Sequence, residues 1–280
     1  MRRYGMCDVC LRTVCGAHVD RGDQPMAQSS RGARGISPGV IPPLRRSDRT
    51  ELLDEAVLDP VELADNLRDI RRVNRLLGGT STVLRHLPRL LDMVPTHGRP
   101  ASILDLATGS ADIPISIARW AKSNHRAVTI VASDSSEQIL SLARDQIAAY
   151  SEISLAQYDA MAVPLPDKQF DIVLCSLALH HFGPDDAVQL LQEMDRLART
   201  GFILNDLRRG RLGFAAAWVA AHLTTRNRLT RHDAPLSVRR AYTPGELDSL
   251  LRRAGINDAT ISTHPWFRMA AVKACRQANE

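Results

Sequence analysis

The chain has 280 residues, of which 44% are hydrophobic and 24% are charged, a composition typical of a soluble globular protein rather than a fibrous or mainly disordered one. The formal net charge of +5 comes largely from the first 50 residues and from the stretch between Arg208 and Arg240, which indicates local basic patches. No apolar run approaches the roughly 18 residues that span a bilayer, and the N-terminus lacks the apolar segment of a secretory signal, so we expect a cytoplasmic protein.

Residues 1–48 are rich in Gly, Pro, Ser and Arg and show no hydrophobic periodicity, which predicts a flexible basic extension. Four residues in it have the types and spacing of a small zinc site: Cys7, Cys10, Cys15 and His18. Apolar residues that could pack around a metal are scarce there, so cysteines that bind no metal are the alternative. Cys175 and Cys275 fall in apolar runs and are expected in the core.

Residues 49–98 are expected to form a helical cap that precedes the first strand. Between Asp59 and Met93 apolar residues recur at helical spacing, and Gly78 and Gly79 interrupt the pattern as a helix stop. We therefore expect two helices in this region.

Residues 99–280 alternate between short apolar runs and amphipathic segments. The predicted strands are 102–107, 127–133, 153–157, 170–177, 201–206, 258–264 and 267–275. The predicted helices are 113–122, 137–149, 185–198, 213–223 and 243–254. Apolar strands that alternate with helices indicate a parallel sheet covered on both faces. Because the last two strands are too close in sequence for a crossover, we predict an α/β fold with a doubly wound, mostly parallel seven-stranded sheet and an antiparallel last strand.

The first of these strands runs into a cluster of small residues, ILDLATGSAD, at residues 103–112. In a doubly wound sheet a ligand binds beyond the carboxyl ends of the strands, where the first strand leads into a helix N-terminus. Small side chains let the backbone approach a ligand closely, and the helix that begins near Asp112 offers free N–H groups. The segment predicts a binding site, with a tight turn that binds no ligand as the alternative.

Three further polar segments follow strands that end at the same edge. Asp134 ends the second strand, where a carboxylate can accept hydrogen bonds from ribose hydroxyls. Asp159 follows the third strand, where an acid can accept a hydrogen bond from an adenine amine, with Ala160 near the base. The fourth strand ends in a loop that carries His180 and His181. Each acid alone is typical of a loop or a helix cap, but together they describe an adenosine-shaped site.

These segments, taken in order, resemble the motifs of the class I S-adenosylmethionine-dependent methyltransferases. ILDLATGSAD is similar to the first motif of that family, ASDSS to the acidic second motif, and YDAMAVPLPDKQFDIVLCSLALHHF to the third and fourth. The resemblance covers about residues 60–276, and it implies a Rossmann-like methyltransferase fold with S-adenosyl-L-methionine as the cofactor. Ala107 and Ala111 stand where the first motif usually has glycines, which argues against a pyrophosphate-binding nicotinamide dehydrogenase more than against this cofactor.

The resemblance also implies roles for individual residues. Asp105 would orient the methionine amino group, and Gly109 would lie under the methionine portion. Asp134 would hold the ribose, and Asp159 would bind the adenine. The residues implied in cofactor binding are Asp105, Ala107, Thr108, Gly109, Ala111, Asp134, Ser135, Asp159, Ala160 and Ser176.

Methyl transfer from a sulfonium needs mainly alignment and a dry cavity. If the acceptor is a phenol or an enol, a base would help, and the resemblance puts His180 or His181 at the mouth of the pocket. A loop pair that satisfies backbone carbonyls is the alternative for the two histidines. Asp206, which ends the fifth strand, either binds substrate or caps the following helix. We assign no metal to the catalytic site.

Residues 208–240 form an insertion whose apolar stretch, LGFAAAWVAAHL, is flanked by arginines. Because the chain leaves the sheet at its carboxyl edge, we expect a lid in which Phe214 and Trp218 contact an apolar acceptor. The same helix could instead rest on an anionic membrane surface, so peripheral membrane contact is open. An ordinary packed helix with a solvated arginine rim is the alternative.

The sequence therefore favours an S-adenosylmethionine-dependent methyltransferase that acts on a small apolar or phenolic acceptor, a secondary metabolite or a quinone-like lipid. The alternative is a non-catalytic or nucleic-acid-binding protein on a methyltransferase-like fold. Aromatic residues make up only 4% of the chain, and those of the basic insertion lie on its apolar stretch, so nucleic-acid binding is disfavoured. The acceptor atom and the oligomeric state stay open.

Overall fold

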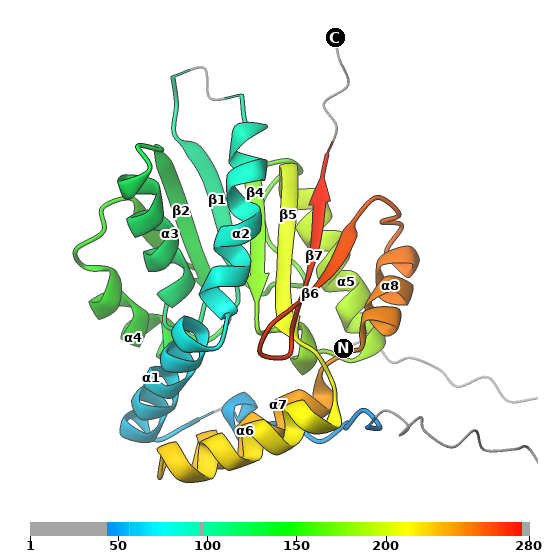
Figure 1. Ribbon diagram of the computed structural model, residues 1–280. Coiled ribbons are helices and arrows are strands. Elements are labelled where there is room, and N and C mark those ends of the chain that lie inside the picture. The colour runs from blue at the N-terminus through cyan, green and yellow to red at the C-terminus, as the bar shows by residue number, and fades with distance from the viewer. Residues whose placement is uncertain (1–43, 56, 96–97, 276–280) are drawn as a thin grey trace, which may run out of the picture. The chain divides into compact units, whose positions relative to one another are not determined.

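The computed structural model describes residues 44–55, 57–95 and 98–275, which contain a seven-stranded sheet of order β3-β2-β1-β4-β5-β7-β6 (Figure 1). Its strands are β1 (Ala101–Leu106), β2 (Val128–Asp134), β3 (Ile153–Gln157), β4 (Phe170–Ser176), β5 (Ala198–Leu207), β6 (Thr260–His264) and β7 (Arg268–Ala274). β7 pairs antiparallel with both β5 and β6, and the other neighbouring pairs are parallel. The predicted fold class is confirmed, including the antiparallel last strand.

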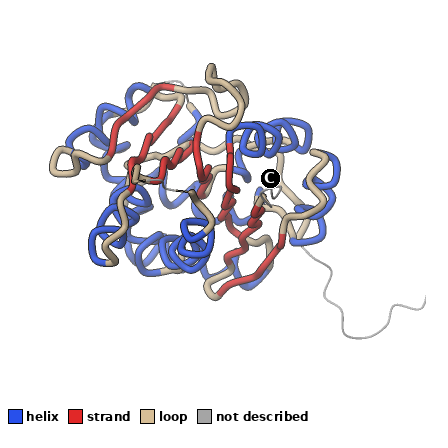
Figure 2. Tube along the Cα trace, turned by 90° about the horizontal axis from the view of Figure 1, so that it is seen from above, coloured by secondary structure: helices blue, strands red, loops and turns tan. Residues whose placement is uncertain are grey.

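Helices cover both faces of the sheet (Figure 2). They are α2 (Gly79–Asp92), α3 (Asp112–Ser123), α4 (Glu137–Ile147), α5 (Pro184–Leu197) and α8 (Pro244–Arg253). α2, α3 and α4 share one core with Ile103, Ile130 and Ile172 of the central strands. α5 and α8 share a second core with Leu104 and Val173, which point to the opposite face. Because the central strands are buried on both faces, they read in the sequence as continuous apolar runs.

The two predicted N-terminal helices form as α1 (Pro60–Leu76) and α2. Asp59 caps α1 by accepting a hydrogen bond from the backbone N–H of Glu62 at 2.8 Å. Gly78 separates the two helices with a φ of +83°, a left-handed conformation that glycine adopts without steric cost. A short 3₁₀ helix, η1 (Leu52–Asp54), precedes α1 and was not predicted.

The insertion after β5 contains two helices rather than one: α6 (Arg211–Thr224) and α7 (Arg228–Arg240). The sequence of α7, RLTRHDAPLSVRR, is polar and holds Pro235, which is why it was not predicted as a helix. Asn227 caps α7 by accepting a hydrogen bond from Thr230 N, and Leu229 and Leu236 are buried on its inner side. The insertion is therefore a helical hairpin.

Some expectations lie outside the described residues. These are the cysteine and histidine cluster at 7–18 and most of the predicted extension 1–48. Among the helices of the described residues, none combines the length and the apolar character needed to cross a membrane.

Candidate functional site

The turn between β1 and α3 exposes backbone to a cavity. Ala107, Gly109 and Ala111 all have positive φ angles, of 53°, 57° and 58°. For the two alanines this conformation costs about 1–2 kcal/mol each, and strain of this kind gathers at functional sites. A Cβ atom at Gly109 would meet no described atom within 4 Å. The turn thus has room for a ligand where glycine stands.

The cavity beside this turn has a volume of about 600 Å³ and lies at the carboxyl ends of β1, β2 and β4. Ligand pockets typically have about 300–1,000 Å³, so this one suits a molecule of cofactor size. Eight of the predicted site residues line it: Asp105, Ala107, Thr108, Gly109, Asp134, Ser135, Ser176 and His181. Further lining comes from α1 and from Leu53, Asp54, Glu55 and Leu58, a region that was predicted only as a helical cap.

Asp105 lies at the bottom of this cavity and is 1% exposed. Its Oδ2 accepts a hydrogen bond of 2.6 Å from the Thr108 hydroxyl, whereas its Oδ1 has no hydrogen-bond partner among the described residues. Burial raises the pKa of Asp105 to about 7. A buried carboxylate oxygen without a partner costs free energy, so it marks a position where a ligand donor would be stabilised.

Asp134 ties the end of β2 to the turn. Its Oδ2 accepts a hydrogen bond from Gly109 N at 3.0 Å, and its Oδ1 accepts one from Ser136 N at 3.1 Å. Burial raises the pKa of this carboxyl group, although those N–H groups oppose the shift. The carboxylates of Asp105 and Asp134 thus both contact the turn, the first through Thr108 and the second through Gly109.

The histidine loop forms a second 3₁₀ helix, η2 (Leu179–His181), directly after β4. His180 is buried, and its Nδ1 lies 2.7 Å from Asp206 Oδ1. Asp206 Oδ2 also accepts a hydrogen bond from His180 N at 2.9 Å. Burial alone would raise the pKa of Asp206, but the contacts with His180 and two backbone N–H groups lower it overall. Asp206 therefore orients His180; it neither lines the cavity nor caps α6, whose N-cap is Gly210.

His181 lines the cavity, and its Nδ1 lies 2.8 Å from Asp54 Oδ1. Glu51 sits beside both histidines, with Oε1 at 3.7 Å from His180 Nε2 and Oε2 at 3.8 Å from His181 Nε2. Glu51 is 2% exposed at its side chain, and burial raises its pKa to about 7. The sequence analysis missed Glu51 and Asp54, because acidic residues before an amphipathic helix carry no distinctive pattern.

Two arginines hold residues 44–55 against the histidine loop. Arg46 donates hydrogen bonds of 2.7 Å to the carbonyls of Arg240 and Phe182. Arg240 in turn donates from Nε to the carbonyl of His180 at 3.0 Å, and its Nη atoms donate to the carbonyls of Arg49 and His181. Both charged side chains thus act as backbone anchors.

Asp233 of α7 anchors η1. Its two carboxylate oxygens accept hydrogen bonds from Leu52 N and Leu53 N, both at 2.9 Å. Because Leu53 and Asp54 line the cavity, the insertion fixes one wall of the site through α7.

Seven predicted site residues do not line the cavity. Ala111 is packed in the core, and Asp159 is exposed with its Oδ1 accepting a hydrogen bond from Met161 N. Phe214 and Trp218 also do not line the cavity. The residues that α6 buries are Gly213 and Ala221, whereas Trp218 is 50% exposed and stacks on His222. The full set is Ala111, Asp159, Ala160, His180, Asp206, Phe214 and Trp218.

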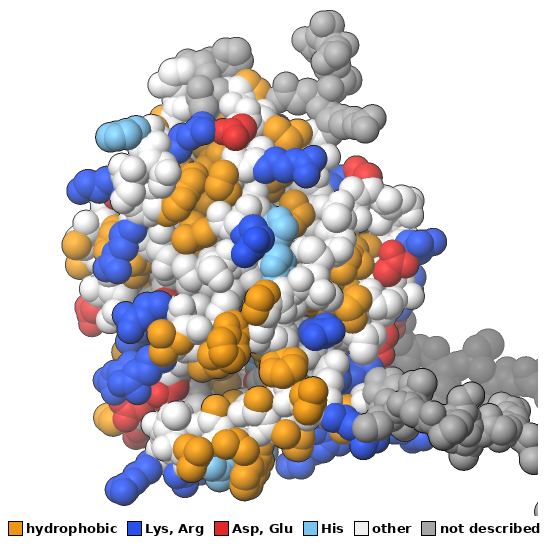
Figure 3. Space-filling view, in the orientation of Figure 1, with side chains coloured by type: hydrophobic (Ala, Val, Ile, Leu, Met, Phe, Trp, Pro, Cys, Tyr) orange, Lys and Arg blue, Asp and Glu red, His pale blue; other side chains and the backbone are white. Residues whose placement is uncertain are grey.

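Large exposed apolar side chains gather near one end of the described molecule, where Figure 3 shows them over α6. They come from α1 and the residues just before it, from α6 and from the turn between β6 and β7: Val57, Val61, Val73, Leu76, Leu212, Trp218, Val219, Leu223 and Trp266. The apolar side of α6 is thus turned outward rather than into the cavity.

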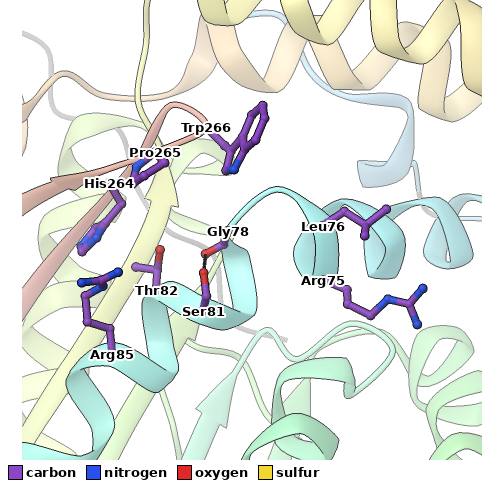
Figure 4. Close-up of a pocket in the computed structure, with 9 residues that line it drawn as sticks. All are labelled: Arg75, Leu76, Gly78, Ser81, Thr82, Arg85, His264, Pro265 and Trp266. Atoms are coloured by element: carbon purple, nitrogen blue, oxygen red, sulfur yellow. Dashed lines mark hydrogen bonds between the residues drawn. The ribbon is translucent and has the colours of Figure 1, made fainter.

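A second, smaller cavity lies between the start of α2 and the turn between β6 and β7 (Figure 4). Arg85, His264 and Trp266 are among its lining residues, and the Ser81 hydroxyl at its edge donates to the Gly78 carbonyl at 3.3 Å. Its volume of about 150 Å³ is below that of typical ligand pockets. The larger cavity is therefore the candidate site.

Comparisons with known proteins point to the same region of the chain. Residues 103–201 match the family model of a methyltransferase domain. Over 103 residues the chain is 37% identical to the demethylmenaquinone methyltransferase of Deinococcus radiodurans, which covers 36% of this chain and 40% of that protein. Over 102 residues it is 33% identical to a ubiquinone/menaquinone biosynthesis C-methyltransferase of Geobacter sulfurreducens, which covers 35% of this chain and 38% of that protein. The chain spans about two fifths of the length of these curated relatives.

A solved structure shares the fold. It is a SAM-dependent methyltransferase from Aquifex aeolicus, with a TM-score of 0.52 and 15% sequence identity, and the match covers 77% of this chain and 98% of that one. At this identity the likeness concerns the architecture, and it agrees with the strand order and the antiparallel last strand described above.

Proposed function

Because the chain belongs, through residues 103–201, to the class I S-adenosylmethionine-dependent methyltransferases, we propose that it transfers a methyl group from S-adenosyl-L-methionine to a small apolar or quinone-like acceptor. The observation that carries the proposal is the single cavity in which the β1–α3 turn and the histidine loop meet. The lining of this cavity combines exposed backbone and carboxylates with apolar side chains and an imidazole.

The residues at the turn fit the methyl donor. Asp105 Oδ1 is a buried acceptor without a partner, which suits the amino group of the methionine portion. Gly109 leaves open space beside the backbone, and Asp134 lies where the ribose hydroxyls would follow. Asp159, which lies just beyond the neighbouring strand β3, remains our proposed partner for the adenine amine, with Ala160 beside the base. When bound, the cofactor supplies a methyl carbon activated by the sulfonium.

The acceptor would lie against the apolar part of the cavity lining. This part includes Leu53, Leu58, Leu63, Leu67, Ile70 and Phe182. Such a wall excludes water and favours an aromatic or prenylated molecule over a charged one. A quinone-like acceptor fits this chemistry, in keeping with the names of the two relatives.

The histidine loop would act on a hydroxyl of the acceptor. The carboxylate of Asp54 accepts the proton of His181 Nδ1, which leaves the lone pair of Nε2 available. A phenol or enol that loses its proton becomes a stronger nucleophile at oxygen or at the adjacent ring carbon. In this proposal His181 contacts the acceptor, and Asp206 positions the loop through His180.

Binding and turnover test the proposal separately. Isothermal calorimetry with S-adenosyl-L-methionine and with S-adenosylhomocysteine should show one saturable site for each. Incubation with the methyl donor and a short-chain demethylmenaquinol, beside a catechol and a monophenol, should then yield a product heavier by one methyl group. A purified, folded protein that binds neither cofactor form would contradict the assignment.

A further inference from the structure

We propose that Glu51, His180 and His181 form a binding site for a divalent first-row transition-metal ion at the rim of the acceptor cavity. Among the described residues, these three form a group in which one potential ligand atom from each lies within 4.8 Å of the others. Two ligands of one Zn²⁺ ion stand about 3.4 Å apart, so small side-chain movements would close the group around an ion. Two imidazoles and one carboxylate are a donor set that suits Zn²⁺ and Fe²⁺.

The hydrogen bonds of the two histidines support this site independently of their spacing. Each imidazole presents Nδ1 to a carboxylate, His180 to Asp206 at 2.7 Å and His181 to Asp54 at 2.8 Å. A carboxylate can only accept, so each Nδ1 carries the proton and each Nε2 has a free lone pair. Metal-binding histidines almost always have such a partner on the other ring nitrogen. Both Nε2 atoms lie near Glu51.

Glu51 supplies the negatively charged ligand, and its buried carboxylate lacks a full set of hydrogen bonds. Its Oε1 has no hydrogen-bond partner among the described residues. The nearest guanidinium, that of Arg240, stays 3.7 Å away at Nε and donates its hydrogen bonds to backbone carbonyls. A bound cation would satisfy this oxygen, as buried carboxylates require.

The charges around the group also favour a dication. The carboxylates nearby are Glu51, Asp54, Asp206 and Asp233, and the guanidinium groups that reach the same loop are those of Arg46 and Arg240. The carboxylates outnumber the cations by two when both histidines are neutral. Arg268 also interacts with Asp206 and reduces this excess, so the group keeps a net negative charge that attracts a cation.

The role of such an ion rests on the proposed methyl transfer. His181 lines the acceptor cavity, so an ion held by its Nε2 would have an open coordination position toward that cavity. With the Nε2 lone pair bound to it, the ion would take over the part proposed for the free imidazole: it would orient a phenolic or quinol oxygen and stabilise its ionised form. No metal was predicted at this site from the sequence, in which Glu51 lies far from the two histidines.

The test measures metal binding directly. The full chain with Cys7→Ser, Cys10→Ser and Cys15→Ser removes the thiolates of the N-terminal segment. After equilibration with Zn²⁺ and gel filtration, this protein should retain one equivalent of zinc, as measured by elemental mass spectrometry. With Co²⁺ it should give a visible spectrum without a thiolate charge-transfer band. Failure to retain an equivalent would overturn the proposal.

Substitutions locate the ion. In that background Glu51→Gln and His181→Ala should weaken zinc affinity by at least about 100-fold, and Asp206→Asn by about 10-fold, as expected for a ligand and for its orienting partner. His86→Ala is the matched control, because His86 and His264 form another close histidine pair, with 3.1 Å between their Nε2 atoms. Loss of zinc in His86→Ala with retention in His181→Ala would overturn the assignment.

Two further measurements separate this inference from the proposed function. Circular dichroism shows whether each variant is folded, and His181→Ala, a partly exposed residue, provides the decisive case if Glu51→Gln unfolds. Calorimetry with S-adenosyl-L-methionine on the metal-free protein tests the cofactor site alone. Cofactor binding without a zinc equivalent refutes only the metal site, whereas zinc binding without cofactor binding refutes only the proposed function.

Discussion

The two halves of the cavity are built in different ways. The cofactor half comes from consecutive strand ends of the sheet, within the residues that match the methyltransferase domain. The proposed acceptor half comes mainly from the segment around η1 and from α1, outside that match, with His181 and Phe182 added from within it. Arg46, Arg240 and Asp233 hold the η1 segment in place. One half therefore depends on backbone geometry close in sequence, and the other on ionic side chains that join distant segments. This division predicts that substitutions in the first half impair cofactor binding, whereas substitutions in the second half impair use of the acceptor.

The largest effect is expected at Gly109. Gly109→Val places a branched side chain in the open space beside the turn and forces a positive φ on a β-branched residue, so cofactor affinity should fall by more than about 100-fold. Gly255→Val is the matched control, because Gly255 also has a positive φ and open space but lies at the end of α8. Calorimetry should show normal cofactor binding in the control. Equal losses in both variants would mean that strain, not the cavity, is responsible.

A smaller loss is expected at Asp134. Asp134→Ala removes the acceptor for Gly109 N and the proposed ribose contact, each a hydrogen bond to a charged group worth about 1.5–3 kcal/mol, so cofactor affinity should fall about 10- to 100-fold. Asp185→Ala, at a side chain 93% exposed, should leave affinity unchanged. Unaltered binding in Asp134→Ala would remove the ribose assignment.

In the acceptor half the effect should appear in a different parameter. Asp233→Ala frees the N–H groups of Leu52 and Leu53, so η1 should lose its fixed position and the KM for a short-chain demethylmenaquinol should rise about 10-fold. The cofactor dissociation constant should stay within about twofold, because Asp233 does not line the cavity. Asp248→Ala on α8 is the control. A parallel loss of cofactor affinity would show that the two halves are not separate.

A substitution at the amino end of the central strand β4, the end away from the cavity, should affect stability alone. Asp171, at the start of β4, accepts hydrogen bonds from Arg99, Arg199 and Ser102. Burial would raise its pKa, but the hydrogen bonds from Arg99 and the other donors hold it well below the usual range. The stabilisation is therefore complete above the unfolded-state pKa of about 3.9 and is lost as pH falls toward the lower folded pKa.

Asp171→Asn should accordingly lower the free energy of unfolding by about 1.5–3 kcal/mol at pH 7. The difference from the wild type should shrink progressively as the pH falls below about 4, because the unfolded wild type takes up a proton there while the folded carboxylate, with its lowered pKa, is still ionised. Denaturant unfolding at several pH values measures this, with cofactor affinity unchanged at pH 7. A difference that is independent of pH would mean that charge at Asp171 does not contribute.

The sequence predicted what depends on local pattern. The strands, most helices and the cofactor half of the cavity follow from apolar periodicity and from acids placed directly after strands. Glu51 and Asp54 could not be found this way, since Asp54 meets His181 across 127 residues and neither stretch indicates the other. α7 was missed because Pro235 and a polar composition argue for a loop, whereas buried Leu229 and Leu236 stabilise the helix only in the folded chain.

The left-handed alanines of the turn bear on how such a sequence can change. Each costs about 1–2 kcal/mol of strain in the folded chain, but glycine in its place would give the unfolded chain additional conformational entropy worth about 0.4–1 kcal/mol. The strain is the larger of the two, so glycine at Ala107 should stabilise the folded chain by up to about 1.5 kcal/mol, whereas at Ala111 the loss of a fully buried methyl group offsets part of that gain. The turn nevertheless forms in this chain without glycine at either position. A consensus that demands glycine at both positions would overlook chains that fold in the same way.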